Sequence, residues 1–370
     1  MTEQADSKRK ICIIGAGLSG LVCGMRLAKA GFDVHIVEEL TYAGGLMAST
    51  RIGKEYLELL PHHIRKTDKA LLSLIKEEGM DGKLEWFDSL WYGKASRKKL
   101  GYLNDGFSGL INSLIQDITD NGGQIHYSST VTDIMETDAD NVDNGRRYKV
   151  TCILSNSARN TVECDYVIYT GSCRAFVNVS HNLPIPLNTR DQLMNITYSA
   201  CISLMTVLKR QHSEVYFQKT SESLPFNRII NHSNCFGQRN YGGNVVYLVG
   251  NCSITDNLWV ASDRDIMENY FAAFRKLYPM IKKADVKAWR LTKIRYACAD
   301  IYPREDLLNP LEGLFVCADG LYENNTDDKP VNRMEHVVQI ANRVCTELIR
   351  SAEATEAADE EDKSIVTPIA

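Results

Sequence analysis

The sequence predicts an α/β (α+β) protein in which a sheet-plus-helix domain is inserted into a nucleotide-binding domain. An apolar run ending at Ile14 precedes glycines at 15, 17 and 20, an amphipathic stretch, and a second apolar run at 34–37 that ends on Glu38. From about residue 187 to 290, strand-like segments surround one helical segment at 263–278. The first order, strand, glycine turn, helix and strand, is the one that a Rossmann-type dinucleotide-binding fold requires.

The glycines of the first turn each have a physical task. Gly15 makes the tight turn, Gly17 lets the backbone approach a pyrophosphate, and Gly20 lets the helix pack closely on the strand. The start of the helix adds N–H donors and the positive end of its dipole, both of which suit phosphate. The residues predicted to bind the cofactor here are Gly15, Ala16, Gly17, Leu18, Ser19 and Gly20.

An acidic pair follows the second strand. Glu38 lies eighteen residues after Gly20, where a carboxylate can accept hydrogen bonds from the ribose hydroxyls of an adenosine group. We predict that Glu38 and its neighbour Glu39 bind there. Because an acid disfavours a 2′-phosphate, NADP is not expected.

A second glycine pair, Gly44-Gly45, stands six residues after Glu38. NAD-dependent dehydrogenases do not need it. The segment 11–47 resembles flavoproteins of the amine oxidase and protoporphyrinogen oxidase type, which share their fold with UDP-galactopyranose mutase. The resemblance implies FAD as cofactor, with Gly44, Gly45, Leu46 and Met47 folding over its pyrophosphate. One position departs from the family, because Leu46 stands where an arginine is frequent.

The same resemblance extends to residue 349. It implies that the segment 101–119 returns the chain to the FAD domain, and that Val131 packs at the adenine. It also implies that the strand near 166–169 recrosses the dinucleotide at Thr170-Gly171. A later strand ends on Asp319, expected near the ribityl or pyrophosphate region, and a helix over 332–349 points its N-terminus at the flavin. The last helix adds Asn332 and Met334 to the predicted cofactor-binding residues.

The predicted domains are discontinuous. Residues 1–60, 101–180 and 294–351 form the FAD-binding domain, and residues 61–100 and 181–293 form the substrate domain. The acidic segment 352–370 is expected to be a disordered tail.

Composition excludes several classes of protein. The chain has 370 residues and a net charge of −5, which does not favour nucleic-acid binding. Eleven single cysteines without metal-ligand spacing favour reduced thiols, a cytoplasmic location and no metal. No apolar stretch reaches the roughly 18 residues that a membrane span needs. A small-molecule substrate is expected as partner, while peripheral membrane contact and a homodimer stay open. The basic run 97–99 is read either as a solvated loop or as an attractor of anionic substrate.

The flavin carries the chemistry in such enzymes, so catalytic side chains are harder to predict. His62 and His63 stand where the mutases have a histidine loop beside the flavin, and a neutral imidazole could move a proton. Arg228, like Arg65 and Arg295, could bind a phosphate or carboxylate, and Tyr296 could line the flavin. Lys293 is a positional guess for an oxygen-activating lysine. The catalytic set predicted is His62, His63, Arg228 and Tyr296.

Three functions follow. The first and favoured one is an FAD-dependent oxidoreductase that oxidises a small molecule by hydride transfer to flavin N5. The second is a non-redox flavoenzyme like UDP-galactopyranose mutase, acting on a sugar nucleotide. The third is a flavin-binding protein without catalysis, for which Leu46 is the argument.

Overall fold

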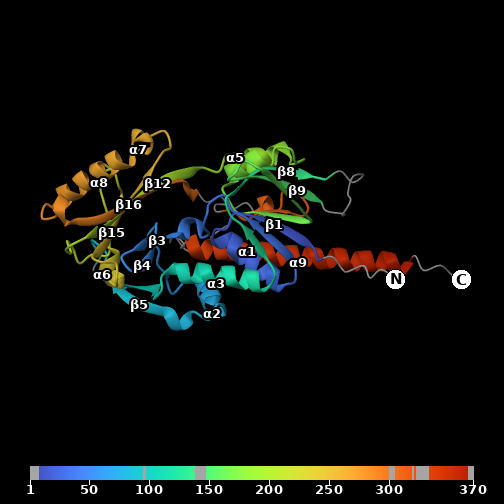
Figure 1. Ribbon diagram of the computed structural model, residues 1–370, viewed down its shortest axis with the longest axis horizontal. Coiled ribbons are helices and arrows are strands. Elements are labelled where there is room, and N and C mark those ends of the chain that lie inside the picture. Colours follow the sequence, from blue (N-terminus) through green and yellow to red (C-terminus); the bar gives the residue numbers. More distant parts are fainter. Residues whose placement is uncertain are drawn as a thin grey trace.

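The computed structural model describes residues 8–94, 97–137, 147–299, 305–318, 321 and 333–365. Two five-stranded sheets organise these residues, one parallel and one antiparallel. Figure 1 shows the antiparallel sheet at one end of an elongated molecule and the long C-terminal helix running toward the other end. The predicted α/β class with a Rossmann-type domain is therefore confirmed.

The parallel sheet has the order β17-β11-β1-β2-β7. In its centre, Ile11 pairs with Val34 on one side and Tyr166 on the other. Three strands carry almost only buried apolar side chains, as expected for a parallel sheet covered on both faces. The strands are β1 (Lys10–Ile14), β2 (Asp33–Val37), β7 (Gln124–His126), β11 (Tyr166–Tyr169) and β17 (Leu314–Val316).

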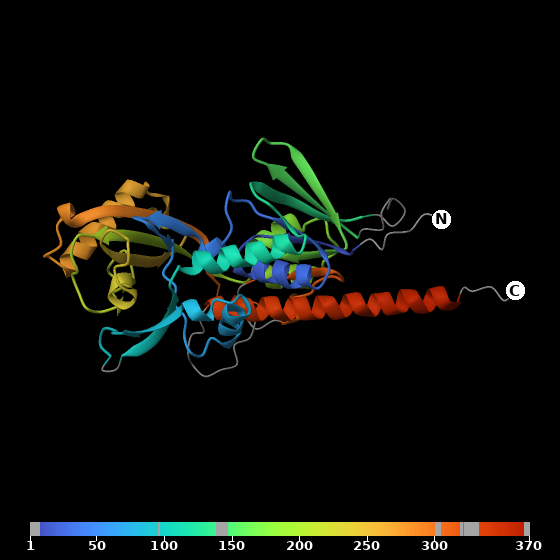
Figure 2. The same cartoon turned by 60° about the horizontal axis from the view of Figure 1, so that its bottom comes forward.

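Helices cover one side of this sheet and a small antiparallel sheet covers the other (Figure 2). The close fit depends on Gly24, because a Cβ there would lie 2.7 Å from Ile36 and 3.1 Å from Ile118. The helices are α1 (Leu18–Lys29), α3 (Phe107–Asp120) and α9 (Arg333–Ile365). The small sheet, in the order β10-β9-β8, comprises β8 (Ser129–Glu136), β9 (Tyr148–Leu154) and β10 (Arg159–Cys164).

Helix α9 corrects one prediction. It continues to Ile365 and projects past the sheet in Figure 2, so residues 352–365 are helical and not a disordered tail. The acidic residues suggested disorder, but the segment is also rich in alanine and glutamate. Both are strong helix formers, and they extend a helix that is already nucleated in the core.

The antiparallel sheet has the order β13-β14-β15-β12-β16. One face packs on helix α8 (Asp263–Leu277) through a separate apolar cluster that includes Ile229 and Leu248. The other face meets strand β4 (Glu55–Glu58), where the Tyr247 hydroxyl donates to the Glu58 carbonyl oxygen at 2.6 Å. The strands are β12 (Tyr198–Leu208), β13 (Phe217–Lys219), β14 (Arg228–Ile230), β15 (Asn244–Cys252) and β16 (Val286–Ala299).

Short hairpins and helices connect the two sheets. The hairpins pair β3 (Ser49–Ile52) with β4 (Glu55–Glu58), and β5 (Leu84–Ser89) with β6 (Lys98–Leu103). The helices are α2 (Lys69–Glu77), α4 (Cys173–Val179), α5 (Leu187–Met194), α6 (His232–Phe236) and α7 (Asn257–Val260).

The predicted division into two domains stays a prediction. The parallel strands fall within the segments predicted for FAD binding, and strands β12 to β15 fall within 181–293. The predicted boundary at 293/294 lies inside β16, which pairs with β12 on both sides of it.

Candidate functional site

The glycine turn after β1 has no room for side chains at two positions. Gly15 has φ +106°, and a Cβ there would lie 2.5 Å from Thr170 Oγ1. A Cβ on Gly20 would lie 2.0 Å from the Gly15 carbonyl oxygen. Because both positions lack a side chain, α1 can lie tightly against the turn, which is the packing expected of Gly20 from the sequence.

The second glycine pair lies directly against the first turn. The Gly44 amide donates to the Ala16 carbonyl oxygen at 2.8 Å, and Gly17 and Gly44 form an isolated parallel bridge. Gly44 and Gly45 have φ +114° and +53°, and a Cβ on Gly45 would lie 3.0 Å from Gly17 Cα. The loop of Gly44, Gly45, Leu46 and Met47 therefore meets the first glycine turn backbone to backbone.

Glu38 lies under the same turn. Its Oε2 accepts from the Ala16 amide at 2.7 Å, and its Oε1 accepts from the Leu40 amide at 2.8 Å. The side chain is buried, and burial raises the pKa of the carboxyl group while the backbone donors oppose that rise. A carboxylate has about four lone-pair sites, so acceptor capacity remains for ribose hydroxyls. The neighbouring Glu39 is exposed.

A dinucleotide fits this arrangement. Gly17 is the N-cap of helix α1 and has no side chain to accept a hydrogen bond, so the first-turn N–H groups, from Leu18 to Gly20, lack a side-chain cap. A Cβ on Gly17 would meet one backbone atom, Gly45 Cα, at 3.9 Å, which is ordinary contact. The cradle between the two glycine loops is thus open to a ligand at Gly17 and closed by protein at Gly15 and Gly20.

Among the other predicted cofactor residues, Thr170 and Gly171 follow β11 at the same end of the parallel sheet as the first glycine turn. Thr170 Oγ1 donates to the carbonyl oxygens of Ile14 and Gly15, and a Cβ on Gly171 would lie 2.5 Å from the Tyr169 hydroxyl. Val131 is half-buried on β8, whose Ser129 amide donates to the Glu38 carbonyl oxygen. The side chains of Met47 and Met334 are buried. Asp319 and Asn332 lie outside the described residues.

The two predicted catalytic histidines point to different partners. His62 Nε2 lies 2.9 Å from the Leu46 carbonyl oxygen, in the second glycine loop. Because a carbonyl can only accept, Nε2 carries the hydrogen, and burial lowers the pKa of the ring. At neutral pH, His62 is therefore a neutral imidazole with Nδ1 unprotonated.

His63 turns to the antiparallel sheet instead. Its Nδ1 lies 3.1 Å from the Tyr216 hydroxyl, and burial, with neighbouring positive charge, lowers its pKa to about 3. Tyr216 was not predicted, because no spacing relates a lone tyrosine to a histidine 153 positions away. The structure thus brings His62, but not His63, into contact with the glycine loops.

Arg228 and Tyr296 lie apart from the histidines. Arg228 shares the face of the sheet that carries Ile230 and Tyr247, and its guanidinium donates to the amide oxygens of Asn227 and Asn251. The Tyr296 ring lies edge-on to Tyr198, 5.4 Å between centroids. No hydrogen bond or ring contact joins either residue to His62 or His63 within the described part of the chain.

Lys293 does not belong to this site. Its Nζ donates to the carbonyl oxygens of Trp259 and Ala261, and it lies 3.7 Å from Asp263. It pairs with Ile202, which packs in the cluster beneath α8. The positional guess of an oxygen-activating lysine is therefore wrong, since this side chain faces α8.

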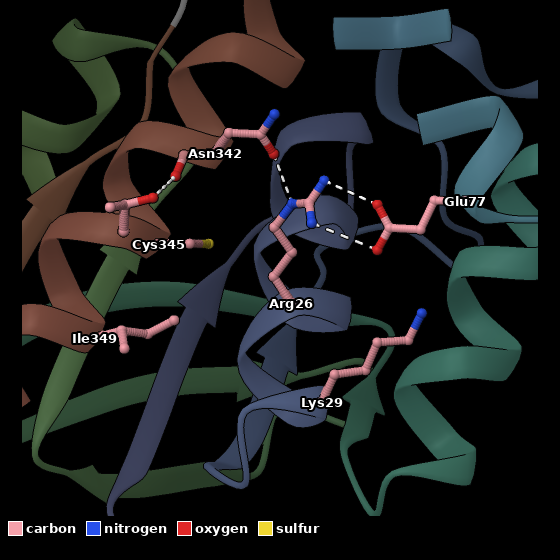
Figure 3. Close-up of a pocket in the computed structure, with 7 residues that line it drawn as sticks. Arg26, Lys29, Glu77, Asn342, Cys345 and Ile349 are labelled. Carbon is pink, nitrogen blue, oxygen red and sulfur yellow. Dashed lines mark hydrogen bonds and ion pairs between the residues drawn. The ribbon is translucent and has the colours of Figure 1, made fainter. Parts of the chain in front are cut away.

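A pocket of about 460 Å³ lies among α1, α2 and α9 (Figure 3). Arg26 donates there to Asn342 at 2.6 Å and forms a two-pronged ion pair with Glu77. Arg26 stands eight residues beyond Leu18, roughly 12 Å along the helix from the glycine turn. The pocket is therefore separate from the cradle, and its arginine is already neutralised.

Comparison with known proteins agrees with this geometry. A model of NAD(P)-binding Rossmann-like domains matches residues 13–77, and the model of flavin containing amine oxidoreductases matches residues 84–322. The second match covers more than half of the chain. The protein belongs to the flavin containing amine oxidoreductase family, and its cofactor is FAD, in agreement with the sequence prediction.

Individual relatives are similar over shorter or more divergent stretches. The L-amino-acid oxidase of Vipera ammodytes ammodytes is 31% identical over 109 residues, 28% of this chain and 22% of that protein. The phytoene desaturase of Fusarium fujikuroi is 32% identical over 99 residues, 25% of this chain and 17% of that protein. The matched segments thus span about a fifth of the length of these curated relatives.

Solved structures share the fold over almost the whole chain. A candidate protoporphyrinogen oxidase from Exiguobacterium sp. 255-15 matches with a TM-score of 0.73 at 12% identity, over 94% of this chain and 99% of that one. Putrescine oxidase bound to putrescine matches with a TM-score of 0.66 at 12% identity, over 93% and 99%. At such identities the likeness concerns the fold alone.

Proposed function

We propose that this protein is an FAD-dependent oxidoreductase that oxidises a small molecule. The observation that carries the proposal is the contact between the two glycine loops, in which the Gly44 amide bonds the Ala16 carbonyl beside the Glu38 carboxylate. A dinucleotide laid across this point would meet the N-terminus of α1, an open cradle at Gly17, and an acid at its ribose.

The residues proposed to hold FAD follow from their places around the cradle. Gly15, Gly17 and Gly20 with the first turn of α1 bind the pyrophosphate, and Glu38 binds the adenosine ribose. Gly44, Gly45, Leu46 and Met47 cover the pyrophosphate, while Val131, Thr170 and Gly171 border it. When bound, FAD supplies two-electron oxidation by accepting a hydride at N5.

His62 is the side chain that we propose acts nearest the flavin. Its N–H holds the Leu46 carbonyl, which orients the ring and keeps Nδ1 free of a proton at neutral pH. A neutral Nδ1 can accept a hydrogen bond or a proton from a substrate group. His63, Arg228 and Tyr296 are proposed to line the substrate side.

The relatives do not agree on a substrate. Their names refer to L-amino acids, phytoene and putrescine, so none of these substrates is assigned to this chain. We propose a small-molecule substrate whose chemical class is selected by the residues around His63.

We further propose a cytoplasmic protein. Its support is the cysteine chemistry, because the thiols of Cys12, Cys23, Cys152, Cys317 and Cys345 are buried and unbridged. None of the described helices is both long and apolar enough to cross a bilayer. A homodimer and a peripheral membrane contact stay predictions from the sequence.

The test is the visible absorbance spectrum of the purified protein, followed by release and identification of the chromophore. We expect a flavin spectrum and FAD released on denaturation, then bleaching of the flavin by a substrate without prior reduction. Turnover that instead requires reduced flavin and leaves no net redox change would support the mutase-like alternative. A colourless protein that does not bind added FAD would overturn the proposal.

A further inference from the structure

The turn between α8 and β16 gathers positive charge. Helix α8 ends at Leu277 and strand β16 begins at Val286, and the segment 275–290 around this turn has six basic residues and one acidic residue, Asp285. Figures 1 and 2 show the turn at the tip of the molecule, opposite the end of α9. The basic segment therefore projects from one end of an elongated molecule.

Backbone hydrogen bonds join this turn to the end of β12. The Lys209 amide donates to the Asp285 carbonyl oxygen at 2.8 Å, and Val286 pairs with Leu208. Within the turn, the Lys282 amide donates to Asp285 Oδ2 at 2.8 Å, and the Asp285 amide donates to the Lys282 carbonyl oxygen at 2.9 Å. Lys209 therefore lies beside the cations of the turn, and the backbone that carries them has a defined conformation.

The single acid of the segment cannot balance these cations. Asp285 is buried, and its Oδ1 lies 3.1 Å from Arg210 Nε, so it compensates one charge. Six further cations are exposed, and none of them forms an ion pair with an acidic residue that the structure describes. Lys287 bonds only a neutral group through its ammonium, the Gly242 carbonyl oxygen. We term these six residues the basic tip: Lys209, Arg275, Lys276, Lys282, Lys283 and Lys287.

Large apolar side chains stand beside the basic tip. Leu277 is 39% exposed, Met280 55% and Trp289 42%. Trp289 pairs with Thr206, and Leu291, two residues further along β16, packs in the apolar cluster beneath α8. Because alternate residues of a strand share a face, Trp289 lies on the α8 side of the sheet. Exposed apolar side chains and exposed cations therefore occupy the same end of the molecule.

The charge of the molecule is separated along its length. The chain as a whole carries −5, and the acidic segment 353–362 lies in the part of α9 that projects at the opposite end (Figure 2). Electrostatic interactions at a surface are screened over about 8 Å at physiological ionic strength. A partner that touches the basic tip therefore meets its local positive charge and not the net negative charge of the chain.

A bilayer surface with anionic lipids suits both features of this tip. Each lysine or arginine near such a surface strengthens binding by about 1.4/2 of a tenfold step, which is about fivefold. Tryptophan concentrates at the membrane interface, and exposed leucine and methionine side chains can enter the boundary between headgroups and acyl chains. Nucleic acid would also attract the cations, but its phosphate backbone gives Leu277 and Met280 nothing to contact. The apolar side chains thus favour lipid.

We propose that the basic tip, together with Leu277, Met280 and Trp289, binds the surface of membranes that contain anionic lipids. The cations lie at the headgroups and the three apolar side chains enter the interface, so the contact is peripheral. The proposal gives a location to the membrane contact that the sequence left open. It does not depend on the proposed function, because no residue of the tip belongs to the flavin site.

The experiment is flotation of the full-length, flavin-loaded protein with vesicles. One set is pure phosphatidylcholine, and the other contains about 30 mol% phosphatidylserine. The double variant Lys276→Gln/Lys283→Gln removes two cations of the tip. Its matched control is Lys76→Gln/Lys149→Gln, which makes the same change in net charge at exposed lysines on α2 and β9, with Lys76 in the last turn of its helix as Lys276 is.

We expect the protein to float with the anionic vesicles and not with phosphatidylcholine alone. Raising the salt from about 0.1 M to about 0.5 M should weaken binding about tenfold or more. Lys276→Gln/Lys283→Gln should weaken it about tenfold or more, while the control double variant stays within about twofold. Circular dichroism establishes that each variant is folded.

A second pair of variants tests the apolar part. Met280→Gln should weaken vesicle binding about threefold. Met194→Gln, at a methionine of α5 that is 42% exposed, should leave it unchanged. Equal effects of these two substitutions would contradict insertion of Met280 into the interface.

Three outcomes would overturn the proposal as a whole. They are an absence of binding to the anionic vesicles, equal binding to both sets of vesicles, and equal losses in the two double lysine variants. Fluorescence anisotropy with a duplex DNA of random sequence tests the other polyanion. DNA bound more tightly than the anionic vesicles would assign the tip to nucleic acid and contradict the proposal.

Discussion

His62 Nε2 donates to the carbonyl oxygen of Leu46 across 2.9 Å, and this bond fixes the tautomer of a histidine that we place beside the flavin. It also holds the second glycine loop from outside. At position 46, where the family frequently has an arginine, this chain has a leucine whose side chain cannot bond a phosphate. The backbone carbonyl of Leu46 instead accepts the hydrogen bond from His62.

Replacing His62 tests this bond. His62→Ala removes the donor from the Leu46 carbonyl, so we expect the free energy of unfolding to fall by about 1 kcal/mol and FAD to dissociate several-fold more readily. Thermal melts and the ratio of flavin to protein after gel filtration measure the two effects. His181→Ala is the control, because His181 is exposed and its ring bonds the nearby Asn178 carbonyl oxygen. Unchanged flavin retention in His62→Ala would contradict the role.

Gly17 and Gly20 separate ligand effects from folding effects. A Cβ at Gly17 meets one protein atom at 3.9 Å, so the melting temperature of the Gly17→Ala apoprotein should stay within a few degrees of the unsubstituted apoprotein's. The same variant should weaken FAD binding at least tenfold, because the added methyl group occupies the space of the pyrophosphate. Gly17→Val should abolish FAD retention. Gly20→Ala meets the Gly15 carbonyl oxygen at 2.0 Å and should destabilise the fold itself by about 2 kcal/mol or more.

Melting curves with and without added FAD distinguish these variants. Gly82→Val is a suitable control, because an added Cβ there meets no atom within 4 Å. Full flavin occupancy in Gly17→Val would show that the cofactor does not lie on this turn.

Glu38 is expected to serve both the fold and the cofactor. Glu38→Gln keeps one acceptor oxygen and replaces the other with a donor, so one of the bonds from Ala16 and Leu40 is lost. We expect a loss of about 1–3 kcal/mol in stability and a weaker hold on FAD. Denaturant unfolding of the apoprotein and FAD titration measure these effects, and Glu163→Gln, an exposed position on β10, is the control. Equal behaviour of the two variants would exclude the special role of Glu38.

His232 predicts loss of stability in acid. Burial lowers its pKa from 6.5 to about 3, and its Nε2 lies 3.2 Å from the Tyr241 hydroxyl. The unfolded chain therefore binds more protons than the folded chain between these two values, so stability is complete above pH 6.5 and falls as the pH decreases toward 3. The slope should reach about 1.4 kcal/mol per pH unit for this residue alone.

Urea unfolding at a series of pH values measures that slope. His232→Gln should reduce it by about one proton equivalent, at some cost in stability at neutral pH, because the ring packs against Tyr102 and Phe236. His181→Gln is again the surface control. An unchanged slope in His232→Gln would contradict the assignment.

The spacing of small and acidic residues made much of this protein predictable. Gly15, Gly17, Gly20 and Glu38 act through the backbone of one short segment, so their order along the chain carries most of the information. Thr170 shows where this kind of prediction ends. Only the resemblance to a family pointed to Thr170, and no local pattern predicts its bonds to the carbonyl oxygens of Ile14 and Gly15. The helical part of 352–365 was mispredicted because charge suggested disorder where helix-forming residues extend α9.

By itself, the sequence determined the nucleotide-binding turn, the second glycine loop and the α/β class, and its resemblance to a known family implied the flavin. The turn and the loop depend on local backbone conformation, and the fold class depends on the order and periodicity of the apolar segments. Only the tertiary structure decided that His62 bonds Leu46, that His63 turns to Tyr216, and that Lys293 faces α8. Such contacts join residues separated by up to 153 positions, and their register is set by the packing of two sheets rather than by any local pattern.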